Sequence, residues 1–315
     1  MPLQFFFSTA RSDHSFVTLR RCFGLMLLLA MTLLGGCAST KPPVATTEPV
    51  AHPIRFLLTF DDGPSPMNYM NPTESVLADL ASNPIQPGIK ALFFVQTRGD
   101  TIYPLGQSLL KREYAEGHLI GLHTATNGHR NHRFMKPEQF LASLQTGIDD
   151  INNAIGVQPT LVRPPFWSYD ERTFAGYRTH GLDMMLTDLS ANDGVIWGFN
   201  ASLHKRSNLY KHLAAMRPQL TAGKLPVVDG VIPIVVTFHD VNSYTARHLI
   251  EYMQILLDVA NELNIPVSNT PFYNDRTQLT RAAHARAISS ATEQVALPGM
   301  WGWLWTEAHS LFGGN

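Results

Sequence analysis

Cysteine and charge are both scarce in this chain of 315 residues. It has two cysteines, Cys22 and Cys37, and 16% of its residues are charged, with a formal net charge of −1. Two cysteines near the N-terminus cannot build a disulfide framework or a thiolate metal site in the rest of the chain. The near-neutral charge lacks the basic excess typical of nucleic-acid binding, so no nucleic-acid partner is expected.

The first 36 residues have the pattern of an export signal. Basic residues precede an apolar run over 23–34, which is too short to indicate a membrane span. The sequence Leu-Gly-Gly-Cys ending at Cys37 resembles the lipobox of bacterial lipoproteins, whose cysteine becomes the lipidated first residue. A plain signal peptide with an incidental cysteine is the alternative. The resemblance implies a membrane partner through a lipid anchor on Cys37 in the bacterial cell envelope, and Ala38 favours the outer membrane, facing the periplasm.

Three further segments follow the signal. Residues 37–53 are expected to be the lipidated cysteine and a flexible tether, because four of the sixteen residues over 38–53 are proline. Residues 54–275 are expected to form one catalytic domain. Residues 276–315 form a C-terminal extension rich in tryptophan, which packs under the domain or contacts lipid or a partner.

Strand-like and helix-like patterns alternate from residue 54 onward. Apolar, strand-like runs cover 54–60, 90–96, 118–124, 160–163, 182–189, 232–238 and 265–269. Helix-like stretches include 74–81, 136–155, 209–220 and 246–263. This alternation predicts an α/β fold with a mainly parallel sheet, and seven strands favour a (β/α) barrel over an open sheet.

Chemically active side chains follow the ends of these runs. They are Asp61 and Asp62, His123, Arg163, Asp188 and Asp193, and His239. In (β/α) barrels the active site lies at the C-terminal ends of the strands. Carboxylates and imidazoles without thiolates suit zinc or a similar divalent cation. The adjacent carboxylates are explained if one binds such a cation while the other acts as a base; a simple strand-to-turn junction would leave the other polar strand ends unexplained.

Four motifs in order along the chain resemble those of one family. "TFDDGP", "HTATN", "RPPFW" and "TFHD" are similar to motifs of the polysaccharide deacetylases, the NodB-homology or carbohydrate esterase four family. The resemblance extends from about residue 54 to 270. It implies a distorted (β/α)7 barrel and metal-dependent removal of acetyl groups from N-acetylated sugars.

The resemblance implies catalytic roles for four residues. Asp61 matches the catalytic base and Arg163 the arginine that holds it. His239 matches the general acid, and Asp193 best matches the acid that orients this histidine. The tryptophan that usually follows that acid is absent, so Asp188 competes with Asp193 for the role.

The implied metal site departs from the family pattern at one position. Asp62 and His123 match metal ligands, and Thr124 would brace their loop by hydrogen bonding. The family's second histidine is Asn127 here, and an amide oxygen is a weaker zinc ligand than imidazole. Three alternatives stay open: Asn127 ligates the metal, His129 replaces it, or the metal site is degenerate.

Substrate contacts are expected from the "RPPFW" motif. Pro165, Phe166 and Trp167 would form one wall of a groove, with the indole of Trp167 facing a sugar ring. The backbone N–H of Phe166 would help to stabilise an oxyanion. His132 is interpreted as an ordinary surface histidine.

Together these features predict a metal-dependent N-deacetylase, a hydrolase of carbon–nitrogen bonds, with zinc as the expected cofactor. Its expected partner is an N-acetylated amino-sugar polymer of the cell envelope or an exported polysaccharide. The alternative is a non-catalytic glycan-binding or assembly lipoprotein on the same fold, with its metal site eroded at Asn127. A third possibility is a hydrolase of O-acetyl esters or small amides; no serine motif supports a Ser-His-Asp enzyme.

Overall fold

The computed structural model describes residues 50–98, 103–193, 204–293 and 297–298. The expected signal peptide, Cys37, most of the tether and the tryptophan-rich end lie outside these residues. Within the described part of the chain, no helix is both long enough and apolar enough to cross a membrane.

The strands form one parallel sheet. Its strands are β1 (Ile54–Asp61), β2 (Leu92–Gln96), β3 (Leu119–Thr124), β4 (Leu161–Val162), β5 (Asp183–Met184), β6 (Leu189–Ser190), β7 (Ile232–His239) and β8 (Val267–Phe272). The path from strand to neighbouring strand runs in the order β5-β4-β3-β2-β1-β7-β6. Strand β8 lies outside this path and pairs with β1. The prediction of a distorted (β/α)7 barrel is thereby confirmed.

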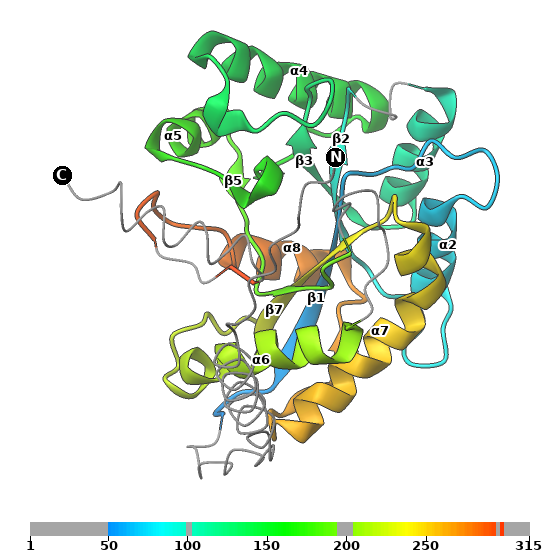
Figure 1. Cartoon of the computed structure of the whole chain (residues 1–315), viewed down its shortest axis with the longest axis vertical. Helices are drawn as coiled ribbons and strands as arrows, with labels where there is room; N and C mark the ends of the chain where they lie inside the picture. Colours follow the sequence, from blue (N-terminus) through cyan, green and yellow to red (C-terminus); the bar gives the residue numbers. More distant parts are fainter. Residues whose placement is uncertain (1–49, 99–102, 194–203, 294–296, 299–315) are drawn as a thin grey trace, which may run out of the picture. The chain divides into compact units, whose positions relative to one another are not determined.

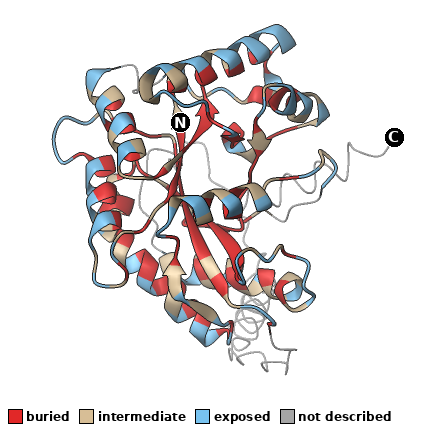
Figure 2. Ribbon diagram, turned by 180° about the vertical axis from the view of Figure 1, so that it is seen from behind, coloured by how far each residue is buried: buried red, intermediate tan, exposed pale blue. Residues whose placement is uncertain are grey.

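Helices surround the sheet, and all of them except the last, which packs against the inner apolar residues of the strands, cover its outside (Figure 1). They are α2 (Pro72–Ala81), α3 (Pro104–Ala115), α4 (Pro137–Ile155), α5 (Glu171–Thr179), α6 (Lys205–Thr221), α7 (Ser243–Glu262) and α8 (Arg276–Ala285). Proline at the first helical position begins α2, α3 and α4, where its missing N–H costs no hydrogen bond. In Figure 2 the strands are mostly buried and the outward sides of the helices are exposed.

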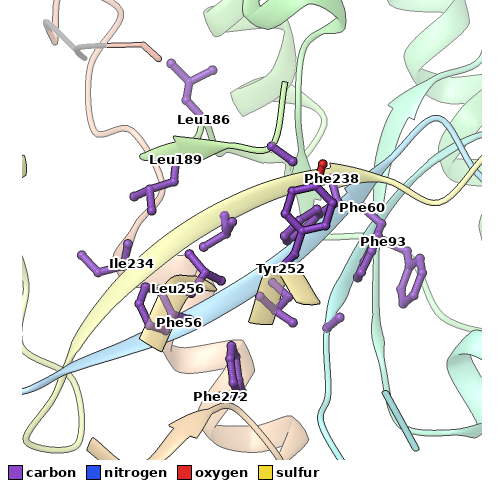
Figure 3. Packing of buried hydrophobic residues seen from close by; sticks show 14 of the residues in the cluster. Phe56, Phe60, Phe93, Leu186, Leu189, Ile234, Phe238, Tyr252, Leu256 and Phe272 are labelled. Atoms are coloured by element: carbon purple, nitrogen blue, oxygen red, sulfur yellow. The ribbon is translucent and has the colours of Figure 1, made fainter. Parts of the chain in front are cut away.

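Alternation along the strands separates two apolar clusters. Outward-facing residues of neighbouring strands pack on one another, as Phe60 stacks on Phe93 and Phe238 at centroid distances of 5.1 and 5.6 Å (Figure 3). They also pack on the helices, since the ring centroid of Phe238 lies 5.3 Å from that of Tyr252 in α7. The second cluster contains Leu57, Leu92, Phe94, Leu161, Met185, Val235 and Tyr273 with Leu279, Ala282 and Ala283 of α8. Because side chains alternate with a period of two, Leu57 and Asp61 share this inner face. The inner face therefore changes from apolar to reactive toward the C-terminal ends of the strands.

Helix α8 belongs to the fold although it falls in the predicted C-terminal extension. Its buried residues Leu279, Ala282 and Ala283 pack in the inner cluster. Further along, Ile288 is 4% exposed and donates its N–H to the carbonyl of Met184 in β5. The domain thus continues past the predicted boundary at residue 275.

The two ends of the strand path are joined by the chain and not by strand pairing. The prediction of one strand over 182–189 is wrong, because β5 ends at Met184 and β6 begins at Leu189. Between them, the carbonyls of Met185 and Leu186 accept hydrogen bonds from the side chain of Arg163 at 3.4 and 2.9 Å. A side chain therefore satisfies backbone groups that would otherwise need a neighbouring strand.

Candidate active site

Asp61 and Arg163 form a buried ion pair at the C-terminal ends of β1 and β4. Nη1 of Arg163 lies 2.8 Å from Oδ1 of Asp61, and their side chains are 0% and 3% exposed. The same nitrogen donates to Oγ1 of Thr59 at 2.7 Å, and the guanidinium lies 4.3 Å from the ring centroid of Phe94. Burial lowers the pKa of Arg163, while Asp61 acts in the opposite direction. The pair fixes the orientation of a carboxylate at the floor of the site.

Asp62, His123 and His129 bring three possible metal-ligand atoms together. Their ligand atoms all lie within 4.8 Å of one another. Nε2 of His123 and Nε2 of His129 are each 3.3 Å from Oδ1 of Asp62, and 2.9 Å from each other. Nδ1 of His123 lies 2.8 Å from the carbonyl oxygen of Arg163, a contact that requires the proton on Nδ1. In the neutral form of this ring, Nε2 of His123 carries the lone pair, and it faces the other two groups.

The donor set fits a divalent cation. Oδ1 of Asp62 is buried and has no hydrogen-bond donor, which is costly unless a positive group lies beside it. Burial raises the pKa of Asp62, but the neighbouring His123, His239 and His129 together lower it below its ordinary value. Burial and then His123 lower the pKa of His129 to about 4, against the opposing effect of Asp62. A carboxylate with two neutral imidazoles suits zinc or a similar metal.

The backbone after β3 explains why His129 reaches this cluster. Gly128 and His129 have φ of 76° and 50°, so two successive residues adopt the left-handed conformation. Glycine tolerates this readily, whereas histidine there is uncommon and indicates a functional or structural constraint. Asn127 is exposed. The structure therefore places His129, the second of the predicted alternatives, beside Asp62 and His123.

His239 and Asp193 form a second pair on the other side of Asp62. Nδ1 of His239 is 2.8 Å from Oδ1 of Asp193, and the N–H of His239 donates to Oδ2 at 3.0 Å. Nε2 of His239 is 3.9 Å from Oδ2 of Asp62. Burial would lower the pKa of His239, but Asp193 and then Asp62 and Asp61 raise it to about 10. This imidazole holds a proton near the carboxylates.

Asp193 is held by residues that the sequence analysis missed. It is 1% exposed, and Thr245 and Asn242 of the α7 region donate to its carboxylate and its carbonyl, respectively. Asn242 also caps α7 by accepting from the N–H of Tyr244, so the asparagine before a helical run was a usable signal.

Asp188 lies in a different environment from Asp193. Its Oδ2 accepts the N–H of Val235 at 2.8 Å, and Arg286 donates to its Oδ1. Of the two predicted partners for His239, the structure therefore brings only Asp193 to it.

The "RPPFW" segment turns sharply above the site. Phe166 and Trp167 have φ of 61° and 53°. Phe166 is 59% exposed, and its ring centroid is 4.7 Å from that of His129. Pro165 is buried, and Trp167 is partly buried against the outer apolar cluster, so Phe166 is the more exposed aromatic face.

His132 is buried, and its interpretation as a surface histidine is wrong. It is 0% exposed, with Nδ1 2.9 Å from the hydroxyl of Tyr177 and Nε2 3.1 Å from Oγ1 of Thr124. Thr124 also contacts Oγ1 of Thr126 at 2.9 Å, so it braces the loop after β3 as expected. Burial, followed by the charges of His123 and His129, lowers the pKa of His132 to about 3.

Asp240 supports the turn that carries Asp62 and was also missed. It is 0% exposed, and Oδ2 accepts a hydrogen bond of 2.6 Å from Oγ1 of Thr73. Its carboxylate packs against Gly63, where an added Cβ would lie 2.1 Å from Oδ2. Only glycine fits between Asp62 and this carboxylate. Burial raises the pKa of Asp240 to about 7.

One edge of the parallel sheet thus carries three groups of side chains. Asp61 is held by Arg163, three possible cation ligands lie together, and the imidazole of His239 is hydrogen-bonded to a carboxylate. This combination is suited to hydrolysis assisted by a divalent cation.

Comparison with known proteins agrees with this class. Residues 51–185 match the family model of the polysaccharide deacetylases. Over 111 residues the chain is 34% identical to a peptidoglycan-N-acetylglucosamine deacetylase of Bacillus cereus, covering 35% of this chain and 36% of that protein. Over 150 residues it is 32% identical to a chitin deacetylase of a Pestalotiopsis species, covering 44% and 46% of the two chains. Over this region the chain is therefore similar to polysaccharide deacetylases, and it matches less than half the length of either relative.

Solved structures share the fold. The chitin deacetylase of Colletotrichum lindemuthianum superimposes with a TM-score of 0.51 at 20% identity, over 70% of this chain and 87% of that one. A family 4 carbohydrate esterase of Streptomyces lividans gives a TM-score of 0.50 at 22% identity, over 76% of this chain and 100% of that one.

Proposed function

We propose that this protein is a metal-dependent N-deacetylase of N-acetylated amino sugars in a cell-envelope or exported polysaccharide. One observation carries the proposal: the Asp61–Arg163 pair, the Asp62–His123–His129 cluster and the Asp193–His239 pair converge at one edge of the sheet. Two relatives are named as deacetylases of peptidoglycan N-acetylglucosamine and of chitin, which supports the proposed substrate class.

Each of these groups of residues is assigned one role in amide hydrolysis. Asp62, His123 and His129 would hold a divalent cation, for which we propose zinc. When bound, the cation supplies polarisation of the acetamide carbonyl and of the attacking water. Asp61, held by Arg163, accepts the proton that the water loses.

The leaving amine needs a proton, and His239 is the group that we assign to donate it. Asp193 holds Nδ1 of His239, so the proton on Nε2 is directed toward the site. The N–H groups of Trp167 and Ser168 donate to the carbonyls of Pro164 and Pro165 within the turn. We therefore assign the N–H of Phe166 to the developing oxyanion.

Acetate release tests this function. The purified protein loaded with zinc should release acetate from N-acetylglucosamine oligomers or peptidoglycan, and removal of the metal by a chelator should stop the release. Asp61→Asn keeps the shape of the side chain but removes the base, so it should lose at least about a hundredfold in rate. Full activity of this variant would refute the assignment of Asp61.

The non-catalytic alternative predicts glycan binding without turnover and little retained metal. Its basis was the loss of a histidine at position 127. Because His129 offers a nitrogen beside Asp62 and His123, that loss is no longer a reason to expect an eroded site. Lipidation at Cys37 and attachment to the outer membrane remain part of the proposal and can be tested by metabolic labelling with a fatty acid and by membrane fractionation.

A further inference from the structure

The loop between β1 and α2 exposes large apolar side chains beside the site. Four successive residues, Met67 to Met70, are exposed. Tyr69 is 79% exposed, Met70 65% and Met67 43%. Single exposed apolar residues are common on protein surfaces, but a cluster of three on one loop indicates a contact surface.

This exposure does not come from a poorly held loop. Ser65 and Asn71, which flank the exposed residues, are 1% and 3% exposed. Nδ2 of Asn71 donates to the carbonyls of Ser65 and Met67 at 2.9 and 2.8 Å. Oγ1 of Thr73 accepts the N–H of Ser65 at 2.9 Å. Buried polar groups thus hold both ends of the loop and keep the apolar side chains at the surface.

The loop borders the site on the side of the proton donor. It begins at Gly63, directly after Asp62. Sδ of Met67 is 3.9 Å from Oγ of Ser243, at the start of α7 and four residues after His239. Because His239 is the proposed proton donor to the sugar nitrogen, the loop is placed next to the path that an adjoining sugar of a bound chain would follow.

We propose that Tyr69, with Met67 and Met70, forms a stacking surface for an adjoining sugar of the glycan chain. The inference rests on the proposed function and adds a residue that distinguishes a polymer from a single sugar. The apolar C–H face of a pyranose packs on an aromatic ring, while its hydroxyls stay in water. No charged residue occurs between Gly63 and Thr73, which suits a neutral sugar better than an anionic headgroup.

Binding to an inactive enzyme tests the surface. In the Asp61→Asn background, loaded with zinc, the affinity for N-acetylglucosamine and for its hexamer is measured by titration calorimetry. Tyr69→Ala should weaken hexamer binding about tenfold, equivalent to about 1.4 kcal/mol, and leave monomer binding unchanged. Tyr69→Phe keeps the ring and should bind the hexamer as the parent does. Val157→Ala is the control, because Val157 is 43% exposed in the turn after α4, before β4 begins.

Several outcomes would overturn the proposal. The proposal fails if Tyr69→Ala binds the hexamer with the same affinity as the Asp61→Asn parent. It also fails if Tyr69→Ala loses affinity equally for the hexamer and the monomer, because that result indicates a structural role for Tyr69. Loss of binding to anionic phospholipid vesicles with unchanged hexamer affinity would identify a membrane contact instead. If the zinc-loaded protein with Asp61 intact releases no acetate, yet Tyr69→Ala weakens hexamer binding in the Asp61→Asn background, the stacking surface stands and the proposed catalysis fails. If neither the protein with Asp61 intact nor the Asp61→Asn protein binds any glycan, both proposals fail.

Discussion

Arg163 holds Asp61 in an ion pair from which water is almost excluded, at 2.8 Å and with 0% and 3% of the side chains exposed. The same guanidinium donates to Leu186 between β5 and β6. One side chain therefore orients the proposed base and connects the two ends of the strand path.

Arg163→Ala should lower the free energy of unfolding by about 3 to 5 kcal/mol, because it leaves the buried charge of Asp61 unpaired. Urea denaturation followed by circular dichroism measures the change. Arg98→Ala removes an ion pair with Asp150 in which Arg98 is 46% exposed, and should cost at most about 1 kcal/mol. Equal costs for the two variants would contradict the role given to Arg163.

His129→Ala should weaken zinc binding about a hundredfold or more, because removal of groups that merely orient a metal ligand already costs 10- to 100-fold. Asn127→Ala should leave the affinity unchanged, since Asn127 is exposed. Competition with a chromogenic chelator gives both dissociation constants. A greater loss with Asn127→Ala would assign the third ligand to the amide.

Asp193→Asn and Asp188→Asn should separate catalysis from stability. Asp193→Asn should reduce kcat by about 10² or more, because His239 loses the carboxylate that orients and charges it. Asp188→Asn should leave kcat unchanged but lower the free energy of unfolding by at least about 1 kcal/mol, since it weakens the pair with Arg286. The reverse pattern would make Asp188 the partner of the acid.

Acid should destabilise the fold through buried histidines. Burial, followed by the charges of Lys90, Arg276 and Arg112, lowers the pKa of His118 from 6.5 to about 3. Between pH 6.5 and pH 3 the unfolded chain binds a proton at this histidine that the folded chain does not. The free energy of unfolding is therefore highest above pH 6.5 and decreases as the pH is lowered. His118 alone should cost about 2 kcal/mol between pH 7 and pH 5.

His118→Asn should therefore flatten the dependence of the unfolding free energy on pH, whatever its effect at pH 7. Phe93→Leu is the matched control, because Phe93 packs on His118 at 5.2 Å between ring centroids and does not titrate. It should lower stability without changing the slope. An unchanged slope in His118→Asn would show that this histidine is not the source.

Ile288→Ala should lower the free energy of unfolding by about 2 to 5 kcal/mol, the usual cost of removing a buried isoleucine side chain. Leu141→Ala, at a position 40% exposed, should cost about 0.5 kcal/mol or less. Thermal and urea unfolding would compare them. A negligible effect at Ile288 would mean that the segment after α8 is dispensable to the domain.

Most strands were predictable because each carries its own apolar pattern. Reactive residues lie at or next to the C-terminal ends of β1, β3, β4 and β7: Asp61, His123, Arg163 and His239. Asp61 and His239 are register partners in β1 and β7, so the sequence places them side by side once the strands are paired. The break between β5 and β6 was not predictable, because it depends on Arg163, which comes from β4. Helix α8 was missed because only three of its ten residues are buried.

The histidines show the same limit. The burial of His132 depends on Tyr177, which is 45 residues away in sequence, and no local pattern indicates this contact. His129 reaches Asp62 through two successive left-handed residues, which the residue types permit but do not dictate. The three-dimensional structure was therefore needed to decide between Asn127 and His129 as the third candidate ligand. Asp62 and His123 could be assigned as candidates from their positions in the sequence motifs.

The direction of β1 has a consequence for how the domain can be handled. The strand enters the domain at Ile54 and delivers Asp61 to the opposite edge of the sheet, roughly 23 Å away at about 3.3 Å per residue. An attachment made upstream of Ile54 is therefore at the end of β1 opposite Asp61. Such an attachment leaves the edge of the sheet that carries the reactive residues accessible to a large substrate.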